Sequence, residues 1–418
     1  MSAPVIESHL HTRPSFDLAD HPLPTGHEEI YRFAPMDRLA PLLDADADWV
    51  AGRVDVSAGP GVAVETVDAV AGLRDAGFVP VDRPSAIGAA MVAQATKVTL
   101  WPDTATPLRS AQHDGVGFSA QHGGVGVSAQ HGGVGVSAQH DGINPLIVQP
   151  NPVILRTVAG SAPSSSAVII EATPNSRGIV LIEHTGPGQF IGNMAVKLGE
   201  GADLTVVTLQ EWDADALHAG LHQAVVGRDA HLRHIAVTFG GSLVRLQTNV
   251  SYDGPGGVAE LFGLYLTDGH QYQEHRLFVD QNQPKTTSRV DYRGALQGQG
   301  ARSAWVGDVL IRRNAEGTDS YEQNRNLLLT PGCVAESVPN LEIETGNIVG
   351  AGHSSATGRF DDEQLFYLQS RGIPENEARR LIVQGFFFDI IARIGVPDVE
   401  RRLRDAVNAE LKYQPEED

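Results

Sequence analysis

The feature that most constrains the fold is a long stretch, from about residue 96 to residue 357, in which helical periodicity is almost absent. It is rich in Val, Ile, Thr and Gly and divides into short runs bounded by Gly, Asn, Asp or Pro. In the run LVRLQTNV, residues Val244, Leu246, Thr248 and Val250 alternate with polar residues, which is the period of a β-strand. Because an ordinary β-sandwich is usually smaller, this length predicts a β-solenoid or a large barrel, and periodicity alone does not choose between them.

Helical signals flank this β stretch on both sides. Before it, EEIYRFAPMDRLAPLL and VETVDAVAGLRDAGF place apolar residues at helical spacing, with Gly77 as the expected end of the second helix. After it, Gly372 is the expected C-cap of a first helix, and further helices are expected to open at Pro374 and after Pro397. The predicted organisation is an N-terminal helical region, a β core and a C-terminal helical domain, at residues 1–95, 96–357 and 358–418.

A nonapeptide repeat interrupts the predicted core at about residues 109–143. The unit SAQHGGVGV places His113, His122, His131 and His140 nine residues apart. This spacing brings no two of the side chains together on a regular element, and each unit has too few apolar residues to bury a coil of its own. Since long Gly-rich loop insertions cost little free energy, we interpret the array as a flexible insertion and not as a metal site.

Composition and motifs exclude several functions. The formal net charge of −20 argues against nucleic acid and anionic membranes as partners, because both need clustered Lys and Arg. The N-terminus does not resemble a secretory signal, and no apolar run approaches about 20 residues, so we expect a cytoplasmic protein. The chain has no G-x-x-x-x-G-K-[ST], H-E-x-x-H or G-x-S-x-G motif, which argues against ATP hydrolysis through a P-loop and against two common hydrolytic sites.

Four histidines near the middle of the chain are possible metal ligands. His218 and His222 fall in a segment with strand character, which places them on one face about 13 Å apart. His231 and His234 offer no better geometry. We therefore expect all four to be ordinary histidines on the surface of strands.

Two other residues remain candidates for metal binding. Cys333 is the one cysteine of the chain, and it is either a small buried apolar residue or a thiolate ligand. His353 falls in a Gly/Ser-rich segment that we expect to be a bend between the last strand and the first C-terminal helix. A four-thiolate iron–sulfur site needs four cysteines, so any cluster that this chain contacts must be ligated mostly by other groups.

Three segments resemble the SufB/SufD family of iron–sulfur cluster assembly proteins. The run HSSATGRFDDEQLFYLQSRGIPENEARRLIVQGF, at residues 353–386, is similar to the C-terminal signature of the family. QNRNLLLTPGCVAESVPNLEI and EEIYRFAPMDRL resemble two further family segments. Within the family the length, the helical N-terminal region and the environment of His353 are more similar to the SufD branch.

The resemblance implies a right-handed parallel β-helix core between helical regions. It also implies a non-catalytic scaffold subunit that pairs with a SufB-like subunit through the C-terminal coils of the β-helix and docks a SufC-like ATPase on the C-terminal helices. ATP hydrolysis would then belong to the partner. A homodimer is an alternative when the chain is alone.

Two residue roles are implied by the resemblance. His353 aligns with a family histidine at the SufB–SufD interface, where iron or a nascent cluster is shared with SufB. Cys333 aligns with a SufB cysteine that receives sulfur or ligates the cluster. At a family segment with further histidine and cysteine residues, this chain has Gln281, Lys285 and Thr286, so we expect no tightly bound cofactor on the isolated chain.

The main alternative function is an enzyme built on a β-solenoid, acting on carbohydrate or transferring an acyl group. Solenoid polysaccharide lyases are generally secreted. Left-handed acyltransferases show hexapeptide repeats led by Ile, Leu or Val, which this sequence lacks.

Overall fold

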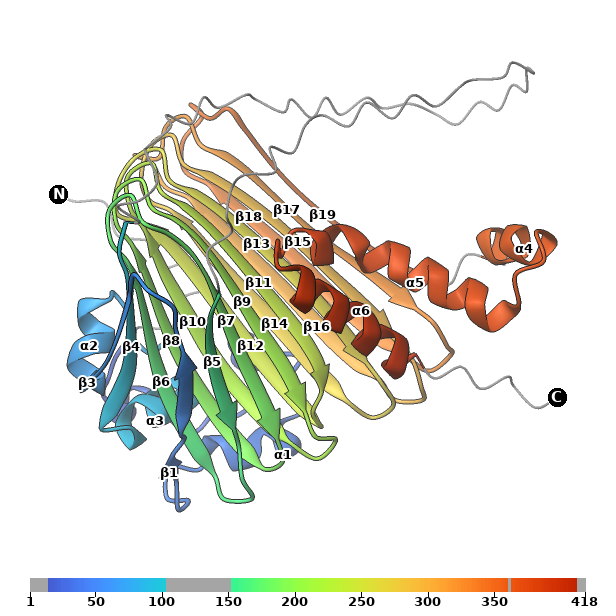
Figure 1. The fold of residues 1–418 in the computed structure, drawn as a ribbon, viewed down its shortest axis with the longest axis horizontal. Coiled ribbons are helices and arrows are strands. Elements are labelled where there is room, and N and C mark those ends of the chain that lie inside the picture. Colours follow the sequence, from blue (N-terminus) through green and yellow to red (C-terminus); the bar gives the residue numbers. More distant parts are fainter. Residues whose placement is uncertain (1–13, 103–151, 360–361, 412–418) are drawn as a thin grey trace.

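The computed structural model describes residues 14–102, 152–359 and 362–411. Its centre is a parallel β-solenoid, in which successive strands alternate between two sheets and each strand pairs with the strand two places further along the chain (Figure 1). The predicted β core is confirmed. Of the two architectures that the sequence left open, the structure is a solenoid and not a barrel, because its strands form two separate sheets that do not close into one ring. The nonapeptide array lies outside the described residues.

The parallel strands have nearly uniform lengths. The first sheet contains β4 (Gln94–Leu100), β6 (Ser164–Ala172), β8 (Gln189–Leu198), β10 (Leu217–Val226), β12 (Leu243–Tyr252), β14 (Tyr272–Gln281), β16 (Arg302–Ile311) and β18 (Val334–Ile343). The second contains β5 (Val153–Val158), β7 (Arg177–Gly186), β9 (Asp203–Trp212), β11 (His231–Gly240), β13 (Val258–Thr267), β15 (Thr287–Leu296), β17 (Asp319–Leu328) and β19 (Gly350–Arg359).

The interior is held together by in-register rows of apolar side chains. In the first sheet Val196, Ala224, Val250, Val279 and Val309 occupy equivalent positions of the five successive strands β8 to β16 and are all buried. Full burial of one such side chain stabilises the fold by about 1.5–3 kcal/mol. Repetition of the row in every coil explains why the chain forms one continuous core.

The turns into the second sheet share one backbone conformation. Two residues before each of six successive strands, φ is positive, which favours Gly, Asn and Asp. The six residues are Asn175, Gly201, Asp229, Gly256, Lys285 and Gly317. This conformation explains why Gly, Asn and Asp mark the ends of the short runs, and it places Lys285 in a turn.

The N-terminal region covers the outer face of the first sheet. It contains η1 (Leu18–Asp20), η2 (Glu29–Tyr31), α1 (Met36–Leu39), η3 (Ala40–Leu43), α2 (Ala69–Asp75) and α3 (Arg83–Met91). Tyr31, Leu39 and Ile87 are buried in one cluster with Ile191 and Leu243 of the sheet.

One predicted helix of this region is half wrong. In VETVDAVAGLRDAGF the first part belongs to strand β3 (Val62–Asp68), which pairs antiparallel with β4, and only the second part is helix α2. Three β-branched residues, Val64, Thr66 and Val67, favour the strand, and pairing with β4 outweighs the helical spacing. Asp68 begins the helix, since its side chain accepts a hydrogen bond from the Ala71 backbone N–H.

The N-terminal end of the solenoid is closed by antiparallel strands. Beside β3, strand β2 (Val54–Ser57) pairs antiparallel with β5, and the short β1 (Val50–Ala51) pairs with β6. The first coil is therefore covered by strands of the same chain.

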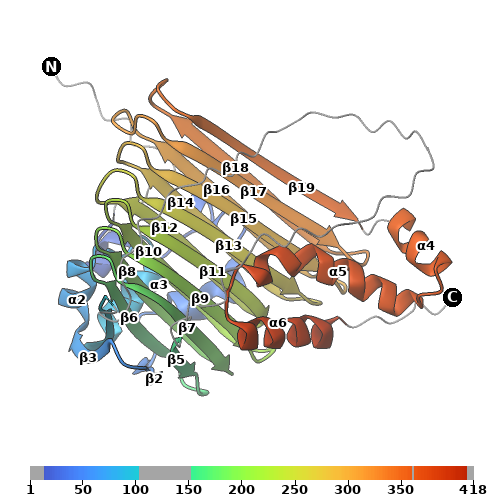
Figure 2. The ribbon, with the colours of Figure 1, turned by 45° about the horizontal axis from the view of Figure 1, so that its top comes forward.

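Three C-terminal helices follow the last strand: α4 (Asp362–Ser370), α5 (Glu375–Ala392) and α6 (Pro397–Glu410). The helices predicted at Pro374 and Pro397 are confirmed, and Gly372 ends α4 with a φ of 85°. Helices α5 and α6 pack on the outer face of the second sheet, whereas α4 projects beyond it in both views (Figures 1 and 2). Within the described part of the chain, no helix is long and apolar enough to cross a membrane.

Candidate functional site

The C-terminal end of the solenoid is open. β18 and β19 form the last strands of the two sheets, and among the described residues no strand pairs with their outer edges. Side chains of both strands are exposed or half-buried, whereas nine of the ten residues of the preceding strand β16 are buried. An unpaired edge presents a row of backbone N–H and C=O groups that can pair with another chain.

His353 lies at this open end, but not in the predicted bend. It is the fourth residue of strand β19 and stands in register with Glu322 of β17. Its side chain is 44% exposed, and its Nδ1 is 3.9 Å from Glu322 Oε1. The predicted bend is wrong. β19 lies at the edge of its sheet and buries few side chains, so its sequence, GAGHSSATGR, has no large apolar residues and no alternation that would indicate a strand.

Glu322 is the residue of this site that sequence reasoning missed. Its side chain is only 1% exposed, and neither carboxyl oxygen has a hydrogen-bond partner among the described residues. Burial, with a smaller contribution from Asp308, raises the pKa of Glu322 to about 8, so the neutral acid predominates at pH 7. A methyl group at Gly307 would overlap this carboxyl, so the glycine makes room for it. The segment DSYEQNRN offered no signal, because nearly all of its residues are polar and no alternation sets Glu322 apart.

Cys333 lies elsewhere, in the turn between β17 and β18. It is partly buried, with Sγ 3.4 Å from the Gly298 carbonyl oxygen. Leu328, the last residue of β17 before this turn, is paired in register with Arg359 of β19. Arg359 follows His353 by six residues along β19, so His353 lies six residues away from the level of the turn. The separation along the strand between Cys333 and His353 is therefore about 20 Å. In the described residues no three His, Cys, Asp or Glu side chains are grouped to hold a metal ion, so both ligand roles stay predictions.

The comparison with known proteins decides the family. Residues 155–386 match the model described as "SUF system FeS cluster assembly, SufBD core domain". The chain belongs to the SufBD family. It is 43% identical over 405 residues to an iron–sulfur cluster assembly SufBD family protein of Mycobacterium bovis, covering 95% of this chain and 92% of that protein. A family member from Mycobacterium leprae is 42% identical over 412 residues, with coverage of 95% and 93%.

A more distant match is the iron–sulfur cluster assembly protein SufD of Escherichia coli, which is 27% identical over 219 residues, or 45% of this chain and 51% of that protein. The resemblance expected from the motifs is confirmed, as is the parallel β-helix with helices at both ends. Membership favours cluster assembly over a carbohydrate-active or acyl-transfer enzyme.

The solenoid of this SufBD family protein buries histidines that were expected on strand surfaces. His218 and His222 of β10 and His234 of β11 all face the interior. His222 Nδ1 is 3.2 Å from His234 Nε2, and Trp212 Nε1 donates a hydrogen bond to His218 Nδ1 over 3.0 Å. The surface prediction is therefore wrong for these three, because polar and aromatic residues replace aliphatic ones in this part of the core. His231 remains partly exposed and contacts Glu260.

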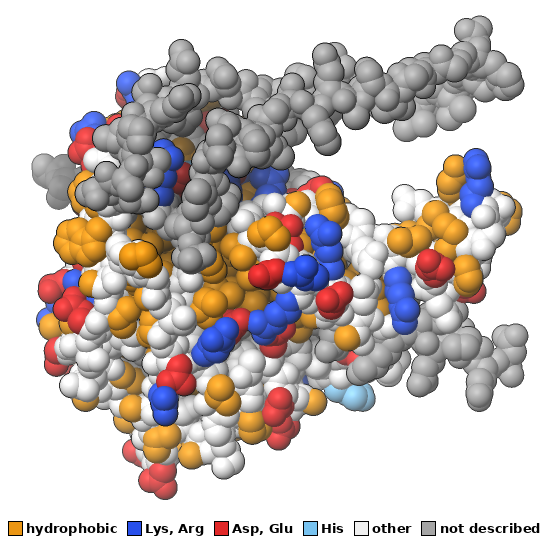
Figure 3. All heavy atoms as spheres, viewed as in Figure 1, with side chains coloured by type: hydrophobic (Ala, Val, Ile, Leu, Met, Phe, Trp, Pro, Cys, Tyr) orange, Lys and Arg blue, Asp and Glu red, His pale blue; other side chains and the backbone are white. Residues whose placement is uncertain are grey.

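The C-terminal helices carry exposed apolar side chains. Figure 3 shows hydrophobic side chains gathered on α4, beyond the edge of the sheet. Phe366 and Tyr367 of α4 are exposed, as are Leu381 and Phe388 of α5. Large apolar side chains grouped on a surface mark sites of protein–protein contact.

Proposed function

We propose that this SufBD family protein is a SufD-like scaffold subunit of an iron–sulfur cluster assembly complex. The observation that carries the proposal is the contrast between the two ends of the solenoid: antiparallel strands close the first coil, whereas no strand of the described residues pairs with the outer edges of β18 and β19. The matches to SufD of Escherichia coli and of Bacillus subtilis support the choice of branch.

A SufB-like subunit is the proposed partner at the open end. Both edges run parallel over ten residues, so a second solenoid could continue each sheet through backbone hydrogen bonds. Exposed apolar side chains accompany these edges: Val334 and Ile343 at the two ends of β18, and Val349 just before β19. Their burial would add hydrophobic stabilisation to the backbone pairing.

A SufC-like ATPase is the proposed partner of the C-terminal helices. The sequence has no P-loop, so energy from ATP must come from another chain. Phe366 and Tyr367 are exposed on α4, which projects beyond the second sheet, and Leu381 and Phe388 are exposed on α5, so these helices offer apolar side chains for contact with a partner.

Iron, or a nascent cluster, is the proposed cargo at the interface. His353 supplies an imidazole and Glu322 a carboxyl group, and neither oxygen of that carboxyl is held by another described residue. Two ligands do not complete a site, so SufB would supply the remaining ones. Cys333 is proposed as a separate thiolate contact, because about 20 Å of strand separates it from His353.

The proposal is tested by co-expression with SufB and SufC homologues and measurement of mass by light scattering. We expect a stable complex and no ATPase activity from this chain alone. Val349→Asp places a charge at the open end and should abolish pairing, while Val158→Asp is the matched control. The two valines are 75% and 69% exposed, and Val158 lies in β5 near the closed end. Failure to associate with either homologue would remove the proposal.

A further inference from the structure

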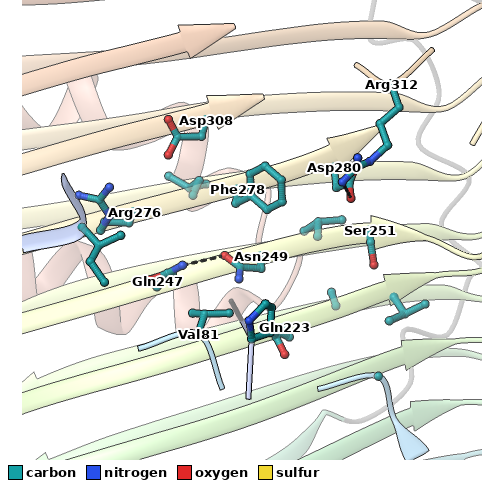
Figure 4. Close-up of a pocket in the computed structure, with 17 residues that line it drawn as sticks. Val81, Gln223, Gln247, Asn249, Ser251, Arg276, Phe278, Asp280, Asp308 and Arg312 are labelled. Carbon is teal, nitrogen blue, oxygen red and sulfur yellow. Dashed lines mark hydrogen bonds and ion pairs between the residues drawn. The ribbon is translucent and has the colours of Figure 1, made fainter. Parts of the chain in front are cut away.

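Two adjoining hollows lie on the outer face of the first sheet. The larger, of about 340 Å³, extends over β10, β12, β14 and β16 and is bounded by Ile30 and Val81 of the N-terminal region (Figure 4). The smaller, of about 150 Å³, lies between β16 and β18. Because Phe278 and Asp308 line both hollows, they form one groove, here called the outer groove.

The outer groove reaches the open edge of the first sheet. Asn340 and Glu342 of the edge strand β18 line its end. Asp308 is in register with Asn340, and Phe278 is in register with Asp308. These two side chains therefore lie one and two strand spacings, about 5 and 10 Å, inside the edge. A partner that continues this sheet past β18 would lie directly beside the groove.

The basic residues that line the groove are already compensated by acidic neighbours. Arg276 forms an ion pair with the buried Glu274, with 3.6 Å between Nη1 and Oε1. Arg312 donates two hydrogen bonds to Asp280, of 2.7 and 2.9 Å, and Figure 4 shows these two side chains together at one end of the larger hollow. Neither arginine is therefore available to bind an anion in the groove.

Two acidic residues of the groove lack such compensation. Asp308 and Glu342 form no salt bridge with another described residue. Asn340 donates a hydrogen bond to one Asp308 oxygen over 2.6 Å, yet burial still raises the pKa of Asp308. A cation beside a buried carboxylate stabilises its charged form and reverses such a shift. The groove therefore favours a basic occupant.

The apolar lining adds a second requirement. Phe278 is half-buried between the two hollows, and Ile30 and Val81 form the wall of the larger one. A large apolar side chain next to a basic one matches this combination. The formal net charge of −20 disfavours a second copy of the chain as the occupant, because two strongly acidic molecules repel each other.

We propose that the outer groove receives a segment of the SufB-like partner that carries an Arg or Lys next to a large apolar residue. The cation pairs with Asp308, and the apolar side chain packs against Phe278. This inference rests on the proposed function and adds a side-chain contact to the pairing of strand edges. Backbone pairing is open to any strand, whereas pockets for side chains provide specificity, so the groove would select this partner.

The first test is calorimetric titration of the chain with a SufB homologue. Asp308→Asn removes the charge and keeps the shape of the side chain, and it should weaken binding at least about tenfold, or 1.4 kcal/mol. Phe278→Ala should weaken binding by a similar factor. Glu200→Gln is the matched control, because it removes one negative charge from an exposed turn after β8, far from β18 in the strand order of the sheet. Its affinity should equal that of the unmodified chain.

A cross-link gives a second readout that does not depend on affinity. Phe278→p-benzoylphenylalanine places a photoreactive group in the groove. Illumination of the complex should join the two chains through a partner peptide that contains Arg or Lys. The same group at Val64, which is 46% exposed in β3 at the closed end, should give no such product.

The outcomes separate this inference from the proposed function. If the SufB homologue binds both variants as tightly as the unmodified chain, or if position 278 gives no cross-link in the complex, the inference is overturned and the scaffold proposal stands. If the homologue does not bind the unmodified chain, both are overturned. A dimer of the isolated chain that Asp308→Asn converts to a monomer would assign the groove to a second copy and would also overturn the inference.

Discussion

Acid should destabilise this protein through its buried histidines. His184 and His234 are buried inside the solenoid, and burial lowers the pKa of each to about 4. His275 is stacked on Tyr265, with ring centroids 5.0 Å apart, and its other neighbour is the tilted ring of Tyr292 at 5.6 Å; burial lowers the pKa of His275 to about 3. In the unfolded chain all three would titrate near 6.5.

The sign of the effect follows from proton uptake. Between pH 6.5 and the folded-state pKa of 3 to 4, the unfolded chain binds more protons than the folded chain, so stability is lost as pH falls through that window. From pH 7 to pH 5, each of the three histidines should lower the free energy of unfolding by about 2 kcal/mol. The three together are comparable to the whole stability of a typical domain.

The assay is urea unfolding followed by far-UV circular dichroism at pH 7 and pH 5. His275→Phe keeps an aromatic ring between the two tyrosines but cannot bind a proton, so the loss between the two pH values should shrink by about 2 kcal/mol. His27→Gln is the control, because His27 is exposed. Equal pH dependence in His275→Phe and the unmodified chain would refute the reasoning.

Three further perturbations have defined outcomes. Gly263→Ala would push a methyl group into the Tyr292 ring and should lower the free energy of unfolding by about 1–3 kcal/mol, measured with urea. The pKa of Glu322, raised to about 8, gives a stabilising contribution that is lost as pH rises from 4.5 towards 8 and that opposes the gain from the histidines; Glu322→Gln should therefore gain more stability than the unmodified chain between pH 5 and pH 7, and an equal gain in both would contradict the assignment. Phe366→Ser should weaken capture of a SufC homologue without changing the melting temperature, whereas Leu23→Ser, which alters an exposed residue of the N-terminal region, should not.

The solenoid could be predicted from the sequence because its signals are local. Alternation such as Val244, Leu246 and Thr248 is repeated in coil after coil, and Gly, Asn or Asp recurs where φ is positive. Strand β3 could not be predicted, because its pairing with β4 is a tertiary contact that helical spacing within the segment does not reveal.

The candidate site was harder to predict than the fold. His353 was selected by resemblance to a family motif, yet its place in an edge strand leaves no apolar alternation to detect. Glu322 was missed because its side chain is buried near the last coil, whereas a polar residue in a strand is normally expected on an exposed face. The buried histidines were predicted on strand surfaces for the same reason. Inside the solenoid they contact other polar or aromatic side chains, so the core here does not show the apolar residues by which a buried position is recognised.

The central claim is that this chain contributes to cluster assembly only together with partners. It is tested most directly by anaerobic reconstitution with iron and sulfide, followed by quantification of both in the isolated chain, in the complex with SufB and SufC homologues, and in the complex carrying His353→Ala or Cys333→Ala. The account predicts no stable cluster on the isolated chain, iron and sulfide on the complex, and less iron with His353→Ala in a complex that still assembles. A stable cluster on the isolated chain, or unchanged iron in the His353→Ala complex, would contradict it.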